Sequence, residues 1–515
     1  MKRILAFILL FLFMVSCAPA QTSGPWWPDS VFYEIFVRSF NDSDGDGIGD
    51  FNGITAKLDY LQSLGVTAIW LMPINPSPSY HGYDVLDYYD VNPQYGTMDD
   101  FKRLLAEAHK RDMHVIIDLV LNHTSSQHPW FQSANSDAQS SYRNWYLWAD
   151  EYVGNHWHGG QAGYYYGFFW SEMPDLNYTN PEVTAEMGKM SLFWLNEVGV
   201  DGFRIDAAKH LVEEGTKFES TPANHEWLKE YYASIKKNTT NAYLIGEIYG
   251  AGALVSKIYK NELDHIFNFE IASGAVNSAN GGANSGIRSA IIFARKDNPE
   301  GNFATFLTNH DQERVMSTLR GDINKAKIAS FLLLTSPGTP FLYYGEEIGM
   351  TGKKPDEYIR TPMQWDTTQN AGFSTGEPWI AVNKDYTERI NVTEQENDPN
   401  SLLNHYRALI ALRDEHAALR TGEAIPVETK NNAVFAMLRQ NKNETLLILV
   451  NLGKSAITDY QLSLEESVLK NGTFQIQTLF GNAEAASLNI ENGLFGNYQP
   501  VPELSAYQML ILKIK

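Results

Sequence analysis

The chain has 515 residues, of which 43% are hydrophobic and 20% are charged, so it is too long for one simple core and two or three domains are expected. Its formal net charge of −21 argues against nucleic acid or an anionic bilayer as a partner, because both bind basic surfaces. A neutral substrate is compatible with that charge, and the 12 Trp, 27 Tyr and 26 Phe residues supply flat apolar faces of the kind that stack on sugar rings.

The N-terminus is typical of an export signal. Two basic residues precede an apolar run over 4–15, which is too short to span a bilayer comfortably. Cys17, the only cysteine, follows in MVSC, which resembles a bacterial lipoprotein cleavage box. We therefore predict that 1–24 is a lipoprotein signal peptide with a short tether, and that a lipid on Cys17 anchors the exported protein to the cell envelope. The alternative is an inert thiol in a signal peptide that is removed.

From residue 31 onward, strand-like apolar runs alternate with amphipathic helices. One helix is expected over 54–64, where Ile54, Leu58, Leu61 and Leu64 share a face, and another over 99–112, capped by Asp99 or Asp100. Repeated β-α alternation predicts a parallel sheet, and eight units fit an α/β fold of the (β/α)8 TIM-barrel type. The eight strand candidates are 31–37, 68–74, 114–120, 199–206, 243–248, 265–271, 304–309 and 339–345.

Two segments depart from this alternation. Residues 124–178 are rich in Trp, Tyr, Gly, Ser and His, lack helical periodicity and follow the third strand, so they predict a small inserted domain. The barrel would then comprise 25–123 and 179–422. Short apolar runs separated by Asn and Gly turns predict an antiparallel β-sandwich domain over 423–515.

Three carboxylic acids stand where a strand-like run gives way to a polar tip. They are Asp206, Glu247 and Asp311, and a fourth run of the same shape ends at His123. The carboxyl ends of parallel barrel strands meet on one face, so these residues are expected to form one site. Paired carboxylates are the usual equipment for breaking glycosidic bonds. The alternative is a set of ordinary strand-end acids that bind Lys or Arg.

Four segments, DLVLNH, GFRIDAAKH, GEIYG and FLTNHD, resemble the motifs of glycoside hydrolase family 13, the α-amylase family, in order and spacing. The resemblance extends from about Trp27 to the C-terminus. It implies that Asp206 is the nucleophile, Glu247 the general acid/base and Asp311 the stabiliser of the transition state.

Arg204 gives a physical reason for one of these roles. It stands two residues before Asp206 on a strand, so both side chains point to the same side, and its charge can keep Asp206 ionised. Glu247 needs a raised pKa to act as an acid, and Asp311 nearby would help to hold it protonated. Asp118 is expected to support Arg204 or the barrel rather than to contact substrate.

The resemblance also implies contacts to the sugars. His123 and His310 would hydrogen-bond the sugar in the cleavage subsite, and Tyr83 would stack on it. In exo-acting members, residues matching Asp84 and an arginine such as Arg360 fix the non-reducing end. The remaining substrate-binding residues are Arg204, Lys209 and His210.

An aspartate-rich loop predicts a calcium site. Alternate carboxylates on a glycine-containing loop converge on a hard cation, which favours calcium over a transition metal. The loop differs from an EF-hand because Gly53 stands at the twelfth position, and it resembles the calcium loop of the oligo-1,6-glucosidase side of the family; a plain solvated turn is the alternative. The expected ligands are Asp42, Asp44, Asp46, Asp50 and the Ile48 carbonyl, with a second candidate site at Asn122, Asp175 and the His210 carbonyl.

Motifs around the acids indicate two specificities. The sequence MPDLN at 173–177 resembles the group intermediate between oligo-1,6-glucosidases and neopullulanases, and 360–380 resembles exo-acting oligo-1,6-glucosidases. Lys209-His210, in contrast, is typical of α-amylases, and α-1,6 enzymes of the family usually carry valine in place of Ala207. We expect a lipoprotein α-amylase that cleaves internal α-1,4 bonds of starch and maltooligosaccharides with retention, with some transglycosylation. The alternatives are an exo-acting α-glucosidase, oligo-1,6-glucosidase or glucanotransferase and, more remotely, a non-catalytic starch-binding protein.

Overall fold

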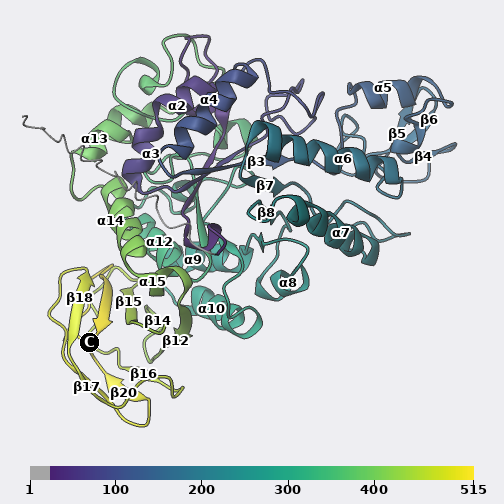
Figure 1. Ribbon diagram of the computed structural model, residues 1–515. Helices are drawn as coiled ribbons and strands as arrows, with labels where there is room; N and C mark the ends of the chain where they lie inside the picture. Colours follow the sequence, from purple (N-terminus) through teal and green to yellow (C-terminus); the bar gives the residue numbers. More distant parts are fainter. Residues whose placement is uncertain (1–23) are drawn as a thin grey trace, which may run out of the picture.

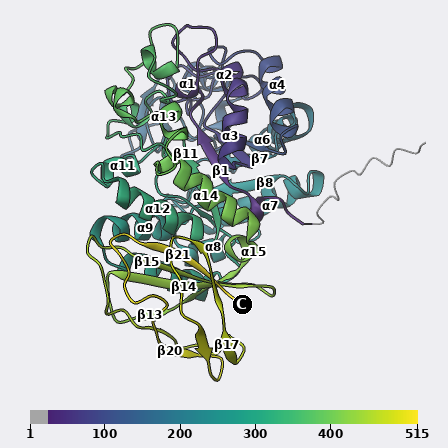
Figure 2. The same ribbon diagram turned by 90° about the vertical axis from the view of Figure 1, so that its left-hand side faces the viewer.

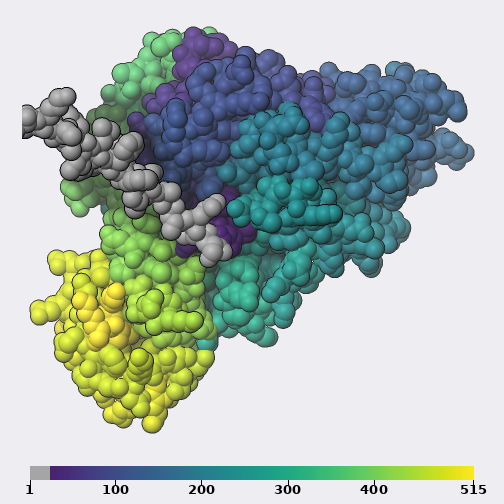
Figure 3. Space-filling view, in the orientation of Figure 1, coloured from purple at the N-terminus to yellow at the C-terminus, as the bar shows by residue number. Residues whose placement is uncertain are grey.

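The computed structural model describes residues 24–515, so most of the predicted export signal and Cys17 lie outside the described residues. A large central region, a projecting inserted segment and a C-terminal lobe are distinct in Figures 1 and 3. Over residues 24–515, no helix combines the length and apolar character that a membrane crossing requires.

Eight parallel strands form the centre of the large region, in the order β10-β11-β1-β2-β3-β7-β8-β9 (Figure 1). A parallel bridge between Phe267 and Ala304 joins the two edges of this sheet, which confirms the predicted (β/α)8 barrel. Each strand lies within its predicted run. The strands are β1 Phe32–Ile35, β2 Ala68–Leu71, β3 His114–Leu119, β7 Gly202–Ile205, β8 Tyr243–Gly246, β9 His265–Ile266, β10 Ala304–Thr305 and β11 Thr339–Tyr343.

Aromatic side chains fill the N-terminal end of the barrel. Phe32 and Phe341 stack with their ring centroids 4.2 Å apart, and Trp27 stacks on Tyr243 at 5.1 Å. These rings belong to one buried cluster that draws on strands from all sides of the barrel. The N-terminal end is therefore a packed core, and the opposite end, where the polar residues follow the strands, is left for chemistry.

Helices surround the sheet (Figures 1 and 2). The predicted helix over 54–64 is two helices that meet at Lys57, although its four apolar residues are buried as expected. The predicted capping residue of the next helix is wrong. Thr97 caps it instead, and Asp100 completes a capping box by accepting from the Thr97 backbone N–H. The helices are α1 Val37–Phe40, α2 Phe51–Ala56, α3 Leu58–Leu64, α4 Met98–His109, α6 Pro181–Phe193, α7 Pro222–Asn238, α8 Ala253–Ile258, α9 Phe269–Gly281, α10 Ser285–Asp297, α11 Val315–Thr318, α12 Ile323–Thr335, α13 Val392–Glu396, α14 Leu402–Glu415 and α15 Ala417–Thr421.

The segment after β3 projects from the barrel (Figure 3). It carries α5 (Pro129–Ser136) and a small antiparallel sheet in the order β4-β6-β5, formed by Trp148–Ala149, Gly163–Tyr166 and Trp157–Gly160. A bridge between His123 and Asp175 joins the two ends of the segment beside the barrel. Its far end therefore extends outward while its base lies next to the predicted site residues.

The C-terminal region is antiparallel, as predicted (Figure 2). A five-stranded sheet, a three-stranded sheet and a two-stranded sheet enclose one apolar cluster. Buried Arg439 on β14 donates to the Thr335 and Gly422 carbonyls at 2.6 and 2.9 Å, so it ties this region to the barrel. The strands are β12 Glu423–Pro426, β13 Glu428–Thr429, β14 Val434–Gln440, β15 Thr445–Asn451, β16 Leu462–Leu464, β17 Gly472–Phe474, β18 Ile476–Phe480, β19 Leu488–Ile490, β20 Phe495–Tyr498 and β21 Met509–Ile514.

Candidate active site

The three predicted catalytic acids line one cavity at the C-terminal end of the barrel. Asp206 directly follows β7, Glu247 directly follows β8, and Asp311 lies on the loop after β10. The cavity has a volume of about 380 Å³. It is also lined by the predicted residues Tyr83, His123, Lys209, His210 and Arg360.

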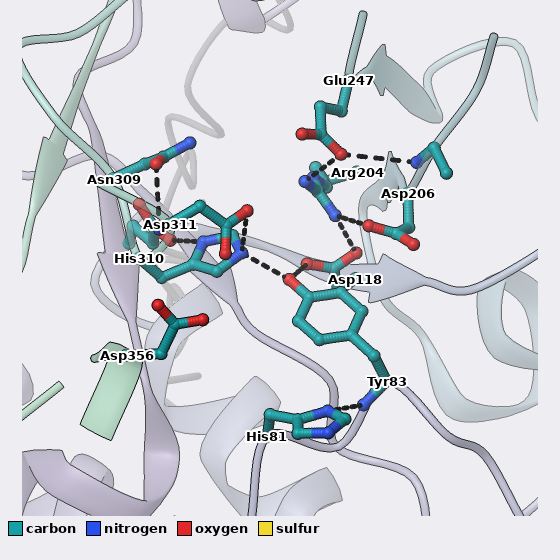
Figure 4. Close-up of polar contacts among 12 residues, drawn as sticks. His81, Tyr83, Asp118, Arg204, Asp206, Glu247, Asn309, His310, Asp311 and Asp356 are labelled. Atoms are coloured by element: carbon teal, nitrogen blue, oxygen red, sulfur yellow. Dashed lines mark hydrogen bonds and ion pairs between the residues drawn. The ribbon is translucent and has the colours of Figure 1, made fainter. Parts of the chain in front are cut away.

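Arg204 contacts three carboxylates at once (Figure 4). Its Nη1 lies 2.6 Å from Asp206 Oδ1 and 2.9 Å from Asp118 Oδ1, and its Nη2 lies 2.8 Å from Glu247 Oε2. The guanidinium is 1% exposed, so water does not screen these contacts. The expected pairing of Arg204 with Asp206 and the support from Asp118 are both present.

Close packing of β7 against β8 brings these groups together. A side chain at Gly202 would lie 2.1 Å from the Tyr243 carbonyl oxygen, so only glycine allows the strands to approach this closely. Immediately after Asp206 the chain turns through a positive φ of 48° at Ala207, whose N–H faces Glu247 Oε2 at 3.4 Å. Asp206 lines the cavity at this turn, where its carboxylate pairs with Arg204.

The acids differ in their electrostatic surroundings. Burial raises the pKa of Asp206 and of Glu247, and Arg204 opposes both rises. The charges of Asp206 and Asp311 raise the pKa of Glu247 further, as expected for a proton donor. Burial also raises the pKa of Asp118, to about 7, against the pull of Arg204. The effect of burial on Asp206 is a finding that the sequence did not reveal.

Asp311 has the opposite tendency. Burial alone would raise its pKa, but His310 and Arg360 lower it well below the usual range. Asp311 Oδ2 lies 3.2 Å from His310 Nε2, and Asp311 Oδ1 lies 3.0 Å from Arg360 Nη2. Asp311 is thus held ionised at the pH at which Glu247 is driven towards its neutral form.

Asp84 and Arg360, which the resemblance implies as contacts to the non-reducing end of a sugar, form no ion pair with each other within residues 24–515. Asp84 is 2% exposed and accepts hydrogen bonds from the hydroxyls of Ser77, at 2.6 Å, and Ser79. Arg360 instead donates to Asp311 and, at 2.9 Å, to the His310 carbonyl. Arg360 lines the cavity, whereas Asp84 is not among its lining residues.

The two predicted histidines and the lysine have definite partners. His123 is buried, its Nε2 faces the Tyr83 carbonyl at 3.1 Å, and burial lowers its pKa to about 4, so it is neutral at ordinary pH. Lys209 pairs with Glu219 at 2.6 Å at the cavity wall. His210 Nδ1 faces the Phe218 carbonyl at 2.8 Å.

The aspartate-rich loop gathers most of its predicted ligands. Oxygens of Asp42, Asp44 and Asp50 lie within 4.8 Å of one another. The carboxylate of Asp46 is outside this group and accepts from the Ile48 N–H at 2.8 Å. A cluster of carboxylate oxygens on a tight loop is a donor set that suits a hard divalent cation.

The second candidate metal site contains an acid that the sequence did not suggest. Asp175 Oδ2 and Glu213 Oε1 are buried without a hydrogen-bond partner, and the charge of Glu213 raises the pKa of Asp175 after the larger effect of burial. Asn122 donates a hydrogen bond that partly offsets this rise. Two buried, incompletely paired carboxyl groups fit a cation between them. Glu213 lies just after the GFRIDAAKH segment, in the sequence HLVEEG. No local pattern there indicates a buried acid or a metal ligand.

Several aromatic residues that line the cavity were not predicted individually from the sequence. Phe169 and Trp170, from the inserted segment, are about half exposed, and Tyr249 is 64% exposed. Tyr80 lines the opposite side. The Trp- and Tyr-rich composition of the inserted segment was the available signal, because exposed aromatic faces suit sugar rings.

The comparisons with known proteins agree with the site. Residues 34–422 match the family described as "Alpha amylase, catalytic domain". The chain belongs to the α-amylase family of glycoside hydrolases. It is 43% identical over 461 residues to Alpha-amylase 3 of Dictyoglomus thermophilum, covering 88% of this chain and 90% of that protein.

Other members of the family are also similar. Oligo-1,6-glucosidase of Parageobacillus thermoglucosidasius is 34% identical over 514 residues, covering 83% of this chain and 91% of that protein. The crystal structure of α-amylase from H. orenii superposes with a TM-score of 0.81 at 39% identity, covering 94% of this chain and 99% of that one. This family member is therefore an enzyme, and its relatives include both α-amylases and oligo-1,6-glucosidases.

Replacing Arg204 by lysine tests the three-way contact. We expect Arg204→Lys to lower kcat on an activated α-glucoside about 100-fold or more, because an ammonium group cannot contact three carboxylates at once. The measurement is the initial rate beside a melting curve. Arg288→Lys, which alters a partly exposed pair with Glu428, is the control and should leave kcat unchanged. A folded Arg204→Lys enzyme with wild-type kcat would contradict the assignment.

Proposed function

We propose that the enzyme hydrolyses internal α-1,4-glucosidic bonds of starch and maltooligosaccharides with retention of configuration. The observation that carries this proposal is that one guanidinium contacts both Asp206 and Glu247, so the two carboxyl groups lie close together on one cavity wall. Closely spaced carboxyls suit a double displacement, whereas an inverting enzyme needs room between them for a water molecule.

The residues then divide the reaction between them. Asp206 attacks the anomeric carbon while Glu247 gives its proton to the leaving glycosidic oxygen, which forms a covalent glycosyl-enzyme. Glu247 then takes a proton from water, the water oxygen attacks the anomeric carbon, and Asp206 leaves as a carboxylate. Asp311 stabilises the positive charge that develops on the sugar in both steps. A sugar hydroxyl in place of water gives transglycosylation.

Internal cleavage is supported by the shape and chemistry of the cavity. Exposed Phe169, Trp170 and Tyr249 offer stacking surfaces beyond the acids, and Lys209 stands on the same wall. Asp84, one of the two residues implied to fix a chain end in exo-acting relatives, is buried, accepts hydrogen bonds from two serines and is not among the residues that line the cavity. These features suit a chain that extends on both sides of the cleaved bond.

A second candidate is an exo-acting α-glucosidase or oligo-1,6-glucosidase. Its support is the 34% identity to Oligo-1,6-glucosidase of Parageobacillus thermoglucosidasius and the position of Arg360 beside Asp311. A non-catalytic starch-binding role is disfavoured because all three acids are present and converge on one cavity.

We also propose calcium as the resident metal. Asp42, Asp44 and Asp50 would supply carboxylate ligands, with Asp46 and the Ile48 carbonyl added by the family resemblance. Asn122, Asp175, Glu213 and the His210 carbonyl form the second candidate site, supported by the two unpartnered carboxyl oxygens. A bound calcium would stabilise these loops. Export and a lipid anchor at Cys17 remain part of the proposal, which rests on the sequence alone.

An end-blocked substrate tests internal cleavage. We expect the enzyme to hydrolyse a maltoheptaoside whose non-reducing end is blocked, and to thin soluble starch. Asp206→Asn should lose both activities by about 1,000-fold or more, whereas Asp59→Asn at the surface should keep them. Hydrolysis of aryl α-glucosides without any attack on the blocked substrate would establish the exo-acting candidate instead.

Chelation tests the calcium proposal. Excess EDTA should lower the melting temperature by about 5 °C, because a ligand bound only by the folded protein stabilises it by mass action. Asp44→Asn should abolish most of this response, since exposed Asp44 makes few other contacts. Asp175→Asn tests the second site in the same way. A melting curve that EDTA leaves unchanged would rule out a stabilising calcium.

A further inference from the structure

Glu34 is a charged residue in the middle of the first barrel strand. It lies on β1 and is 2% exposed, between fully buried Tyr33 and Ile35. Its Oε1 lies 2.5 Å from Nδ1 of His310, and within residues 24–515 its carboxylate forms no other ion pair. Burying a carboxylate costs free energy unless it is paired and hydrogen-bonded. The contact with His310 offsets this cost for Glu34.

The hydrogen bonds around His310 fix its protonation. Tyr83 donates its single hydroxyl proton to Asp118 Oδ2 at 3.0 Å, so its oxygen faces His310 Nε2 at 2.7 Å as an acceptor (Figure 4). Asp311 Oδ2 is a second acceptor 3.2 Å from Nε2. Nε2 therefore carries a proton, and Nδ1 carries the other, which it donates to Glu34. His310 is an imidazolium between two carboxylates.

Charged groups face His310 from several elements, and most of them are acids. Glu34 approaches from β1, Asp118 from β3 and Asp311 from the same loop, while Arg204 on β7 and Arg360 supply the positive charges. Tyr83 is a further titratable neighbour, and Asp206 and Glu247 lie beyond Arg204. Tyr343, which pairs with Glu34 across the sheet, and Glu346 are further titratable groups affected by the charge of Glu34 itself. Burial lowers the pKa of His310, but Asp311 and Glu34 outweigh it and raise the pKa to about 10.

We propose that Glu34 is a positioning residue that holds His310 as an imidazolium and thereby keeps Asp311 ionised and oriented beside the reacting sugar. The inference rests on the proposed function only in giving Asp311 the task of stabilising the transition state. Glu34 acts through His310, because His310 is fully buried between it and the cavity residue Asp311.

Glu34→Gln tests the charge while keeping the acceptor and the shape. Without the carboxylate, His310 loses one of its two imidazole protons at lower pH. The lone pair of an unprotonated Nε2 then faces the Asp311 carboxylate and repels it. Deprotonation of the proton donor Glu247 lowers the activity of both enzymes at high pH, so we expect the ratio of Glu34→Gln to wild-type kcat/KM to be near one at pH 6 and to fall about 10-fold by pH 9. The loss should fall on kcat rather than on KM.

Two variants on the same strand separate this effect from general damage. Tyr33→Phe removes a buried hydroxyl that contacts Glu347, and it should leave the pH profile in place. Glu34→Asp keeps the charge, so its kcat/KM relative to the wild type should not change with pH even if kcat is reduced. A folded Glu34→Gln enzyme whose kcat/KM relative to the wild type does not change with pH would overturn the proposal. Any α-glucoside that the wild type cleaves serves as substrate, so an incorrect linkage assignment does not affect this result.

A measurement on the wild-type enzyme does not require the variant to fold. In protein labelled with ¹⁵N at histidine, His310 should keep both imidazole protons up to about pH 9, and its signals, identified by their loss in His310→Asn, should not titrate near neutrality. A His310 imidazole that becomes neutral at about pH 7 would refute the proposal.

Discussion

The buried guanidinium of Arg204 is the interaction on which the site depends. Its three carboxylate contacts lie at the ends of β3, β7 and β8, and none of these groups is more than slightly exposed. Without a central positive charge, several buried acids would repel one another and take up protons. The barrel supplies this charge on a strand, where packing holds its direction, and Gly202 lets the neighbouring strand approach closely enough to share it.

Around this centre, burial raises the pKa of Asp206 and of Glu247, whereas neighbouring positive charges lower the pKa of Asp311. Glu247 is buried near the acids Asp206 and Asp311. Asp311, in contrast, contacts the positively charged groups of His310 and Arg360. A proton donor and an ionised stabiliser thus stand within one cavity, as a double displacement requires. Burial also makes the site sensitive, because each lost countercharge must be compensated by a change of protonation.

The fold places this centre between two different surfaces. The N-terminal end of the barrel is sealed by stacked rings, including Phe32 and Phe341, and contributes stability. The opposite end is bordered by the inserted segment, whose Phe169 and Trp170 reach the cavity. Specificity for chain length and linkage is therefore expected to reside in these added aromatic residues and in Lys209, whereas the acids themselves are common to the family.

Much of this arrangement was predictable from local pattern. Eight apolar runs that alternate with amphipathic helices predicted the barrel. The acids at the ends of three of these runs predicted a single site on one face of it. The failures concern partners distant in sequence. Glu34 looked like an ordinary strand residue because its partner, His310, lies 276 positions away. The contact of Arg360 with Asp311, 49 positions away, likewise leaves no local pattern in the sequence.

Local chemistry also misled in places. Thr97 and Asp100 both suit a helix start, and only the structure shows that the threonine caps while the aspartate returns a hydrogen bond. Asp46 has the spacing of a metal ligand, which stays a prediction, and its carboxylate also accepts from the Ile48 amide. Spacing selects the candidates, whereas the competing hydrogen bonds decide where each side chain points.

Trapping the covalent intermediate tests the central claim most directly. A maltosyl fluoride with a second fluorine at C5 of the reacting sugar slows the second displacement, so the glycosyl-enzyme should accumulate and be detected by peptide mass spectrometry. The account predicts a single label on the peptide that contains Asp206, attached through its carboxylate. A label on Glu247 or Asp311, or an unlabelled enzyme that releases the inverted anomer, would contradict it.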